Sequence, residues 1–367
     1  MVGAMRVLTV NAGSSSLKLG LLDGDEAVAE ETLERWAGGA EPIRRFLDEY
    51  GADAVGHRVV HGGTRIVAAT MVDDRVLSYL ESLTELAPLH QPRAIAGLRA
   101  ARTAEPDTPS VVCVDTAFHA GLSTAAATYA LPREWNRRWG LRRYGFHGLS
   151  HSHAVVRGAE LAGLPPRQGR VLCCHLGAGA SMAAVRDGRC VDTTMGFTPE
   201  EGLVMNTRSG TVDPGLLGWL LNTKGVAPQD LFDVLAQRSG LAGLSGVSGD
   251  LRDVLAARDS GDADATVAVD VYLHSLVRHA GSMIAVLGGL DLLVFTGGIG
   301  EHQPPVRSAV CEALKFIGTK VDSGLNEEAT QDADISAPGA AVRTVVVQAR
   351  EDLEIARQTR AAATLAT

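Results

Sequence analysis

The stretch Arg6–Gly24, RVLTVNAGSSSLKLGLLDG, has a counterpart in Arg170–Gly188, RVLCCHLGAGASMAAVRDG, and the two align without a gap at an offset of 164 residues. Six of their nineteen positions are identical. Each stretch contains an apolar run, a turn of small residues, a second apolar run and an Asp-Gly pair, which is a strong hairpin-turn signal. The repeat predicts that each half of the chain opens with a β-hairpin and that the fold is a duplication.

The composition is that of a globular protein with two domains. The chain has 367 residues, of which 46% are hydrophobic, and a formal net charge of −9. The negative charge argues against nucleic acid or an acidic membrane as a partner, because both require a basic face. Neither a run of about 18 apolar residues nor a signal-peptide pattern is present, so we expect a cytoplasmic protein.

Strand-like and helical patterns alternate along the chain, which predicts a layered α/β architecture. We expect strands at 54–63, 110–119, 290–298 and 342–347, and helices at 30–50, 75–101, 147–163, 228–257, 263–287 and 351–365. Residues 129–144, rich in Arg, Trp and Pro, predict a connection between the two lobes. The five cysteines lack zinc-site spacing, and we interpret them as buried free thiols.

Three turns rich in glycine or serine each follow a predicted strand: Asn11–Lys18, His175–Ser181 and Phe295–Glu301. Hydroxyl and backbone N–H groups at such turns bind phosphate oxygens. Any one of them could be an ordinary polar turn, and the first lacks the Gly-Lys-Ser/Thr ending of a Walker loop. Three in one chain favour a phosphate site, with the two hairpin turns facing each other across the lobes.

Two arginines, Arg58 and Arg208, lie in apolar or glycine-rich surroundings, where an isolated charge needs a partner. An internal ion pair is the ordinary explanation, but the phosphate-type turns favour an anion clamp. Such a clamp is the equipment of phosphoryl transfer, where catalysis is positioning and charge neutralisation. Asp115, at the end of a predicted strand, is either a cap or a magnesium contact.

Two further groups of residues have simpler interpretations. The spacing of His147, His151 and His153 allows a metal site, but no His-Glu-x-x-His motif supports it. We interpret the arginines of 137–143, which are Arg137, Arg138, Arg142 and Arg143, as a solvated face.

Eleven segments in order along the chain resemble those of the acetate kinase family. They are VNAGSSSLK, GHRVVHGG, LAPLHQP, DTAFH, YGFHGLSH, HLGAGAS, MGFTPEEG, TRSG, SGVSGDLRD, FTGGIGE and EDLEIAR. The resemblance implies two duplicated ribonuclease-H-like (actin-like) lobes with a nucleotide cleft between them. Residues 1–119 would form the first lobe, with the closing helix 351–367 packed on it, and residues 120–350 the second, nucleotide-binding and dimerisation lobe.

The resemblance also implies an activity. The family transfers a phosphoryl group reversibly between ATP and acetate, giving acetyl phosphate and ADP, with Mg²⁺ or Mn²⁺, and it forms homodimers. A propionate or butyrate kinase of the same family remains an alternative, as does a nucleotide-binding regulator with impaired catalysis. Val60 is similar to the residue of acetate-preferring members, whereas propionate-preferring ones tend to have a smaller side chain.

Site residues follow from the matching motifs. The resemblance implies catalytic roles for Arg58, Asp115, His147 and Arg208, with His90, His147 and Arg208 supporting the transition state. Arg58, Val60, Leu89, Phe146 and Pro199 would bind the carboxylate substrate. Asn11, Ser14, Ser16, Lys18, His175, Gly177, Gly179, Asp250, Arg252, Gly297, Gly298 and Ile299 would bind the nucleotide. Asn11, Asp115 and Glu351 would hold the metal.

The chain departs from the family pattern at four places. Ala178 and His302 stand where asparagine is usual, and Thr211 where aspartate is usual. Ala349-Arg350 replaces the Thr-Asn pair before Glu351.

Overall fold

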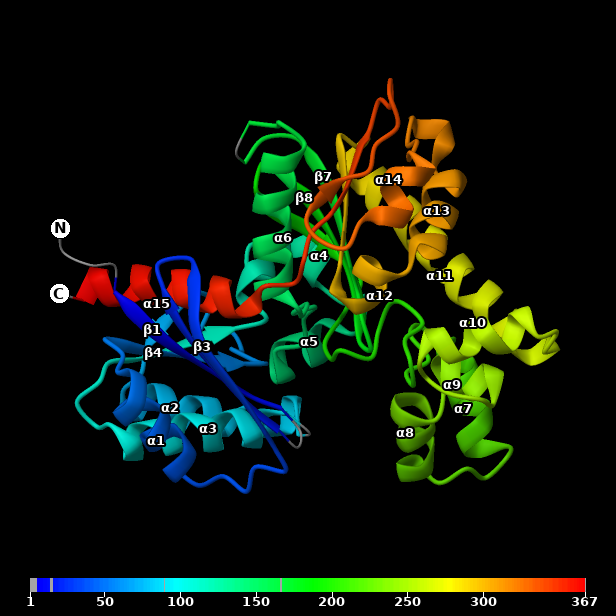
Figure 1. Cartoon of the computed structure of the whole chain (residues 1–367). Coiled ribbons are helices and arrows are strands. Elements are labelled where there is room, and N and C mark those ends of the chain that lie inside the picture. Colours follow the sequence, from blue (N-terminus) through cyan, green and yellow to red (C-terminus); the bar gives the residue numbers. More distant parts are fainter. Residues whose placement is uncertain (1–4, 14–15, 89, 166, 367) are drawn as a thin grey trace. The chain divides into compact units, whose positions relative to one another are not determined.

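Figure 1 shows the computed structural model, which describes residues 5–13, 16–88, 90–165 and 167–366. The chain divides into two compact units. Unit 1 consists of the residues up to Ala120, of Phe146–His153 and of the residues from Arg350 onward, and unit 2 consists of Gly121–Gly145 and Ala154–Ala349. The short piece Phe146–His153, which the family resemblance assigns to the second lobe, packs with unit 1.

Each unit is built on a six-stranded sheet. In unit 1 the strands are β1 (Arg6–Ala12), β2 (Ser16–Asp23), β3 (Glu26–Glu34), β4 (Ala54–Val59), β5 (Thr70–Met71) and β6 (Ser110–Val114), in the order β3-β2-β1-β4-β6-β5. In unit 2 they are β7 (Arg170–Leu176), β8 (Ala180–Arg186), β9 (Arg189–Thr193), β10 (Leu292–Thr296), β11 (Ala333–Asp334) and β12 (Arg343–Val346), in the order β11-β12-β10-β7-β8-β9.

The two sheets repeat one topology. β1 pairs antiparallel with β2 and parallel with β4, and β7 pairs in the same way with β8 and β10. Each sheet then adds a parallel strand, β6 or β12, and an antiparallel edge strand, β5 or β11. The predicted hairpins and the predicted duplication are confirmed. In the second Asp-Gly turn Asp187 and Gly188 have φ of 50° and 74°, the left-handed backbone that this turn requires.

The sheet of unit 1 is covered on both faces, as Figure 1 shows. Helices α1 (Glu41–Tyr50), α2 (Asp74–Ser82) and α3 (Gln91–Ala104) cover one face, with α3 against β1 and β4. The closing helix α15 (Glu351–Ala366) covers the other, against β1, β4 and β6. Gly56 in β4 permits this approach, because a Cβ there would lie 2.6 Å from Ile355 Cγ2.

The sheet of unit 2 lies between α6 (Gly148–Leu161) and α11 (Ala263–Leu287). α11 packs on β7, β8 and β9, and Gly158 of α6 lies against Val294 and Val345 of β10 and β12. The other helices of unit 2 are α4 (Thr124–Ala127), α5 (Arg133–Trp139), α7 (Pro214–Asn222), α8 (Pro228–Gln237), α9 (Gly240–Ser245), α10 (Leu251–Asp259), α12 (Gly297–His302), α13 (Pro304–Ala313) and α14 (Ser323–Glu328).

Two predicted elements differ from the structure. The helix expected over 228–257 is divided into the three helices α8, α9 and α10. The helix expected over 30–50 begins only at Glu41, and Glu26–Glu34 forms strand β3 at the edge of the sheet. Its charged side chains are typical of edge strands, where charge discourages pairing with another chain.

The cysteine prediction is confirmed, since Cys113, Cys173, Cys174, Cys190 and Cys311 are all free and buried. Among the described residues, the helices are all too short or too polar to cross a bilayer.

Candidate active site

In unit 1 the side chain of Arg58 is held between two carboxylates. Its Nε donates to Asp115 Oδ1 at 3.1 Å and its Nη2 to Asp115 Oδ2 at 2.8 Å, a two-pronged pair of planar groups. On the other side Arg58 Nη1 lies 3.4 Å from Glu351 Oε2. Arg58 is the next-to-last residue of β4, Asp115 follows β6 and Glu351 begins α15. The parallel pairing of β4 and β6 therefore creates the cluster at the carboxyl ends of the strands.

Burial shapes the electrostatics of this cluster. Asp115 is only 2% exposed, and Arg58 and Glu351 have side-chain exposures of 23% and 19%. Burial alone would lower the pKa of Arg58, but the charges of Asp115 and Glu351 raise it above its ordinary value. Burial raises the pKa of Glu351, and the charge of Arg58 opposes that shift. The guanidinium therefore stays charged, and Glu351 takes up a proton more readily than an ordinary glutamate.

The same cluster fits a magnesium ion. Two carboxylates against one guanidinium leave one negative charge in excess at this contact. Among the described residues no group of three or more His, Cys, Asp or Glu side chains is arranged to hold a metal. Mg²⁺ does not need one, because it is usually bound by one or two carboxylates together with waters and substrate phosphates. That finding also means that His147, His151 and His153 do not form such a metal group.

The segment Phe146–Gly148 is fixed against the Asp115 strand end. Gly148 N donates to Asp115 O at 3.0 Å, and a Cβ at Gly148 would collide with that carbonyl oxygen. His119 Nε2 lies 2.9 Å from Phe146 O. Burial lowers the pKa of His119 to about 4, so its ring is neutral near pH 7 and Nε2, facing a carbonyl, is the protonated nitrogen. Between these contacts His147 has a φ of 58°, a strained backbone for a non-glycine residue.

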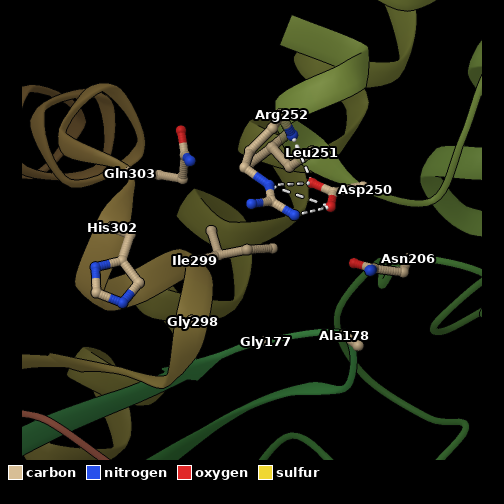
Figure 2. A pocket seen from close by; sticks show the side chains of 10 residues that line it. All are labelled: Gly177, Ala178, Asn206, Asp250, Leu251, Arg252, Gly298, Ile299, His302 and Gln303. Atoms are coloured by element: carbon tan, nitrogen blue, oxygen red, sulfur yellow. Dashed lines mark hydrogen bonds and ion pairs between the residues drawn. The ribbon is translucent and has the colours of Figure 1, made fainter.

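Unit 2 contains a cavity of about 330 Å³, shown in Figure 2. It lies at the turn between β7 and β8 and at the starts of α10 and α12. Its lining consists of Gly177, Ala178, Asn206, Asp250, Leu251, Arg252, Gly298, Ile299, His302 and Gln303. Five of these, Gly177, Asp250, Arg252, Gly298 and Ile299, are residues to which the family resemblance assigns nucleotide binding. Leu251 lies inside the segment SGVSGDLRD, and Asn206 and Gln303 lie outside the eleven segments. Sequence reasoning assigned a role to none of the three.

Glycine turns form one wall of the cavity. Gly177 N donates to Gly179 O at 3.1 Å, which closes the β7–β8 turn. Gly297, with φ of 78°, lies against Leu176, where a Cβ would be 2.8 Å from the carbonyl oxygen. Gly298 faces open space, so a ligand can approach the backbone closely there.

Asp250 and Arg252 form the opposite wall, above Ile299 in Figure 2. Asp250 caps α10 by accepting from Arg252 N at 2.9 Å, and it also accepts from Arg252 Nε at 3.0 Å and Nη2 at 2.5 Å. These hydrogen bonds from Arg252 lower the pKa of Asp250 to about 2. The side chain of Arg252 is 77% exposed. Its planar guanidinium is therefore available to stack on a flat ligand.

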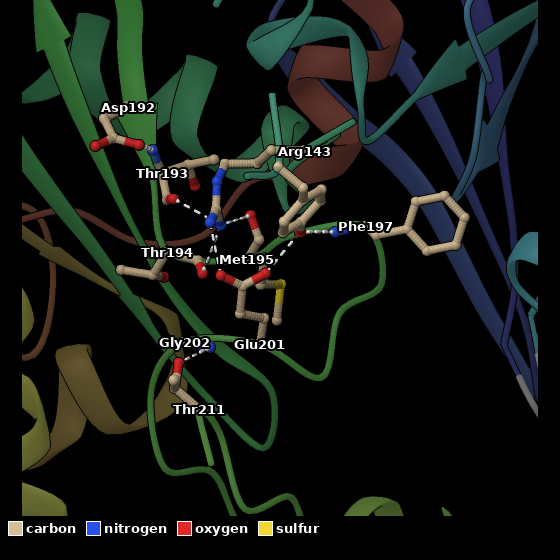
Figure 3. Close-up of polar contacts among 10 residues, drawn as sticks. Arg143, Asp192, Thr193, Thr194, Met195, Phe197, Glu201, Gly202 and Thr211 are labelled. Carbon is tan, nitrogen blue, oxygen red and sulfur yellow. Dashed lines mark hydrogen bonds and ion pairs between the residues drawn. The ribbon is translucent and has the colours of Figure 1, made fainter. Parts of the chain in front are cut away.

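A second polar network in unit 2 shapes the segment before Arg208, as Figure 3 shows. Arg143 Nη1 donates to the carbonyl oxygens of Thr193, Thr194 and Met195 at 3.3, 3.2 and 2.9 Å, and its Nη2 donates to Glu201 Oε1 at 2.6 Å. Thr211 Oγ1 accepts from Gly202 N at 3.1 Å. Arg143 is 18% exposed, so the interpretation of this arginine as part of a solvated face is wrong.

Arg208 lies in the same unit. Its Nη1 donates to Pro199 O at 3.3 Å, and its Nε lies 3.5 Å from Glu200 Oε1. Its side chain is 22% exposed. Arg208 is thus a partly buried cation with one loose carboxylate neighbour, which leaves donors for an anion.

Comparisons with known proteins place this geometry in a family. The model of the acetokinase family matches residues 46–357. The chain belongs to this family. It is 39% identical to an acetate kinase of Thermotoga maritima, over 97% of this chain and 98% of that one. A crystal structure of Porphyromonas gingivalis acetate kinase superposes with a TM-score of 0.92, at 35% identity, over 98% of this chain and 100% of that one. A propionate kinase from Francisella tularensis superposes with a TM-score of 0.89, at 31% identity, over 97% and 99%.

The remaining family positions are distributed over both units. Asn11 is the next-to-last residue of β1 and pairs with Lys18 of β2, and Ser16 begins β2. Val60 follows β4 and His90 precedes α3. In unit 2, His175 pairs with Thr296. Ser14 and Leu89 lie outside the described residues.

The departures from the family pattern also have defined places. Ala178 and His302 line the cavity. Ala349 N donates to Glu301 Oε1 at 3.0 Å, and Arg350 pairs with Asp352 at 3.2 Å. The substitution before Glu351 therefore leaves the contact between Glu351 and Arg58 in place.

Proposed function

We propose that this protein is an acetate kinase, which transfers a phosphoryl group reversibly between ATP and acetate. The observation that carries the proposal is Arg58, held at the carboxyl ends of β4 and β6 by Asp115 and Glu351. Family membership supports it. In this role Arg58 binds the acetate carboxylate, the Asp250–Arg252 wall binds the adenosine, and Arg208 binds the phosphoryl group in transfer.

The chemistry requires cations rather than a base. Acetate is ionised at neutral pH, since carboxyl groups have a pKa of about 4, so its oxygen can attack the γ-phosphorus directly. One P–O bond forms to acetate, one P–O bond to ADP breaks, and no proton moves. The obstacle is repulsion between two anions, which Arg58 and Arg208 reduce.

The proposed magnesium ligands are Asp115, Glu351 and Asn11. When bound, the ion neutralises phosphate charge on the nucleotide. The protein's own side chains have separate roles. Asp115 orients the guanidinium of Arg58 through its two hydrogen bonds. His147, in its strained backbone, hydrogen-bonds the phosphoryl group, and His90 supports it. We assign Val60, Phe146 and Pro199 to the pocket for the methyl group of acetate.

A hydroxamate assay for acyl phosphate tests the proposal. The protein with ATP, Mg²⁺ and acetate is expected to form acetyl phosphate, detected as the iron complex of acetohydroxamate, and to lose this activity in EDTA. Unchanged background signal at saturating ATP and acetate would contradict the proposal.

Propionate is the second candidate substrate, because a propionate kinase superposes over nearly the whole chain. A difference of one methylene in a pocket discriminates by only about 1–3 kcal/mol. The same assay with acetate, propionate and butyrate decides between them. We expect the highest kcat/KM with acetate, since Val60 restricts the pocket.

We further propose a homodimer that works in the cytoplasm. Large apolar side chains are exposed on helices of unit 2, including Trp219 at 47%, Phe232 at 69% and Val267 at 53%. Exposed apolar surface of this kind is common at subunit interfaces. Sedimentation equilibrium of the pure protein is expected to give twice the chain mass, and a monomer at micromolar concentration would contradict the dimer.

A further inference from the structure

Asn206 is a polar side chain of the unit 2 cavity that none of the family motifs assigns. It lies opposite the glycine turn of α12, beside Ala178 and facing the Asp250 side of the cavity in Figure 2. Its Oδ1 is shielded from water and accepts no hydrogen bond among the described residues. A buried acceptor without a donor is destabilising, and this one lies at the edge of a ligand-sized cavity.

The backbone of Asn206 is held rigidly on several sides. Its N–H donates to Ala178 O at 3.3 Å, and its carbonyl accepts from Ala242 N at 2.9 Å. Gly249 packs on its Cβ, where an added methyl group would come within 3.2 Å. These contacts fix the position of the Asn206 Cβ atom. The terminal amide can still rotate about χ2, a torsion with a broad range of allowed angles. The residue can therefore present either end of its amide to the cavity without moving the chain.

Two other polar side chains of the lining, His302 and Gln303, lie on the far side of the cavity from Asn206 in Figure 2. The carboxylate of Asp250 is occupied by Arg252 through four hydrogen bonds from its backbone and side chain. Ala178, Gly177 and Gly298 have no polar side-chain atoms. Asn206 thus offers a neutral acceptor in a cavity whose carboxylate is already satisfied.

We propose that Asn206 binds the nucleoside part of ATP and ADP, accepting a hydrogen bond from a ribose hydroxyl or from the adenine amino group. This inference rests on the proposed function, in that the cavity is taken to hold the nucleotide. Binding relieves the unsatisfied amide, because the ligand supplies the donor that the protein lacks. Asn206 contacts the unreactive end of the nucleotide, so it strengthens the binding of the substrate and of the transition state equally.

Isothermal titration with ADP tests the inference without turnover. Asn206→Ala is expected to raise the Kd for ADP about tenfold, and Asn222→Ala, an exposed asparagine at the end of α7, to leave it unchanged. Asn206→Ser serves as a second variant should the alanine form not fold. In kinetics, KM for ATP is expected to rise with kcat and KM for acetate within twofold of wild type.

Three nucleotide analogues identify the donor. 2′-Deoxy-ADP, 3′-deoxy-ADP and IDP each lack one candidate donor, and the analogue without the true partner is expected to bind the wild type and Asn206→Ala equally. A penalty of the same size with all three analogues would overturn the inference, since it would mark a general structural effect. So would an ADP Kd in Asn206→Ala within twofold of wild type. Absence of ADP binding by the wild type would instead overturn the proposed function together with the inference.

Discussion

At the scale of single residues, Arg208 offers the clearest test of phosphoryl transfer. Its neighbours are Pro199 O and the carboxylate of Glu200 at 3.5 Å, so its removal leaves no fully buried charge behind. Arg58 is a less clean target, because its loss strands the buried Asp115, and breaking a buried pair costs about 3–5 kcal/mol.

We expect Arg208→Ala to lower kcat by a factor of at least about 10³, the usual effect of an arginine on the transferring group. The thermal midpoint of unfolding should stay within a few degrees of wild type. Arg238→Ala, an exposed arginine of the same unit, should retain full activity in the same assay. Near-normal turnover of Arg208→Ala would remove this residue from the mechanism.

The lowered pKa of His57 makes the free energy of unfolding depend on pH. Burial lowers its pKa from 6.5 to about 3, and it is 1% exposed. Between these two values the unfolded chain binds a proton that the folded chain does not, so stability falls as the pH falls. At pH 5 the loss from this residue is about 2 kcal/mol.

Urea unfolding at pH 7 and pH 5 measures this effect. His57→Leu should lose about 2 kcal/mol less than wild type between the two pH values. Equal losses in both proteins would show that His57 is protonated in the folded state or contributes nothing to the pH dependence.

The residue scale also shows what sequence can and cannot reveal about the site. Asp250, Arg252, Gly298 and Ile299 lie in segments with recognisable motifs, and they line one cavity. Asn206 has no such signal, because its place depends on hydrogen bonds to Ala178 and Ala242, distant in the chain. Only the folded structure brings these residues together.

At the scale of elements, periodicity predicted the buried strands well and the edge strand badly. β6 and β10 are entirely buried, with five apolar or small residues each. β3 alternates charged and half-buried side chains such as Glu30 and Leu33, and its charge density suggested a helix. Edge strands bear charge for reasons of solubility, so local composition cannot separate them from a solvated helix.

The docking of α15 on β4 gives an element-scale prediction. A Cβ at Gly56 would contact Ile355 Cγ2 at 2.6 Å and would collide with Thr359. Gly56→Ala should therefore destabilise the protein by about 1–3 kcal/mol, the usual cost of overpacking. Gly281→Ala, inside α11 with open space around it, should instead stabilise by up to about 1 kcal/mol.

Chemical denaturation of both glycine variants compares the two sites. A Gly56→Ala protein as stable as wild type would mean that α15 shifts away from the sheet at little cost.

At the scale of the whole molecule, the repeat seen in Arg6–Gly24 and Arg170–Gly188 extends to two sheets of one strand order. The hairpins share six of nineteen residues, and the pairing of β4, β5 and β6 recurs in β10, β11 and β12. Topology is therefore better preserved than side chains. The sequence pattern does not predict that unit 1 is discontinuous, because the packing of Phe146–His153 depends on contacts such as that between Gly148 and Asp115.

Helix α15, at the end of the chain, packs on unit 1, and we expect the stability of unit 1 to depend on it. α15 buries Leu353 and Ile355, at 6% and 1% exposure, against the sheet. Arg360 donates to Met5 O and Leu22 O. Each buried aliphatic side chain is worth about 1.5–3 kcal/mol, a large share of a total stability of about 5–15 kcal/mol.

A chain that ends at Ala349 should therefore lose the fold of unit 1 and keep that of unit 2, which has its own sheet between α6 and α11. Hydrogen exchange followed by mass spectrometry measures this: β1, β4 and β6 should exchange rapidly, and β7, β8 and β10 should stay protected. A chain that ends at Thr364 is the control, since Leu365 is 90% exposed. Protected β1 and β4 in the shorter chain would mean that the helices on the opposite face, α1, α2 and α3, hold the sheet without α15.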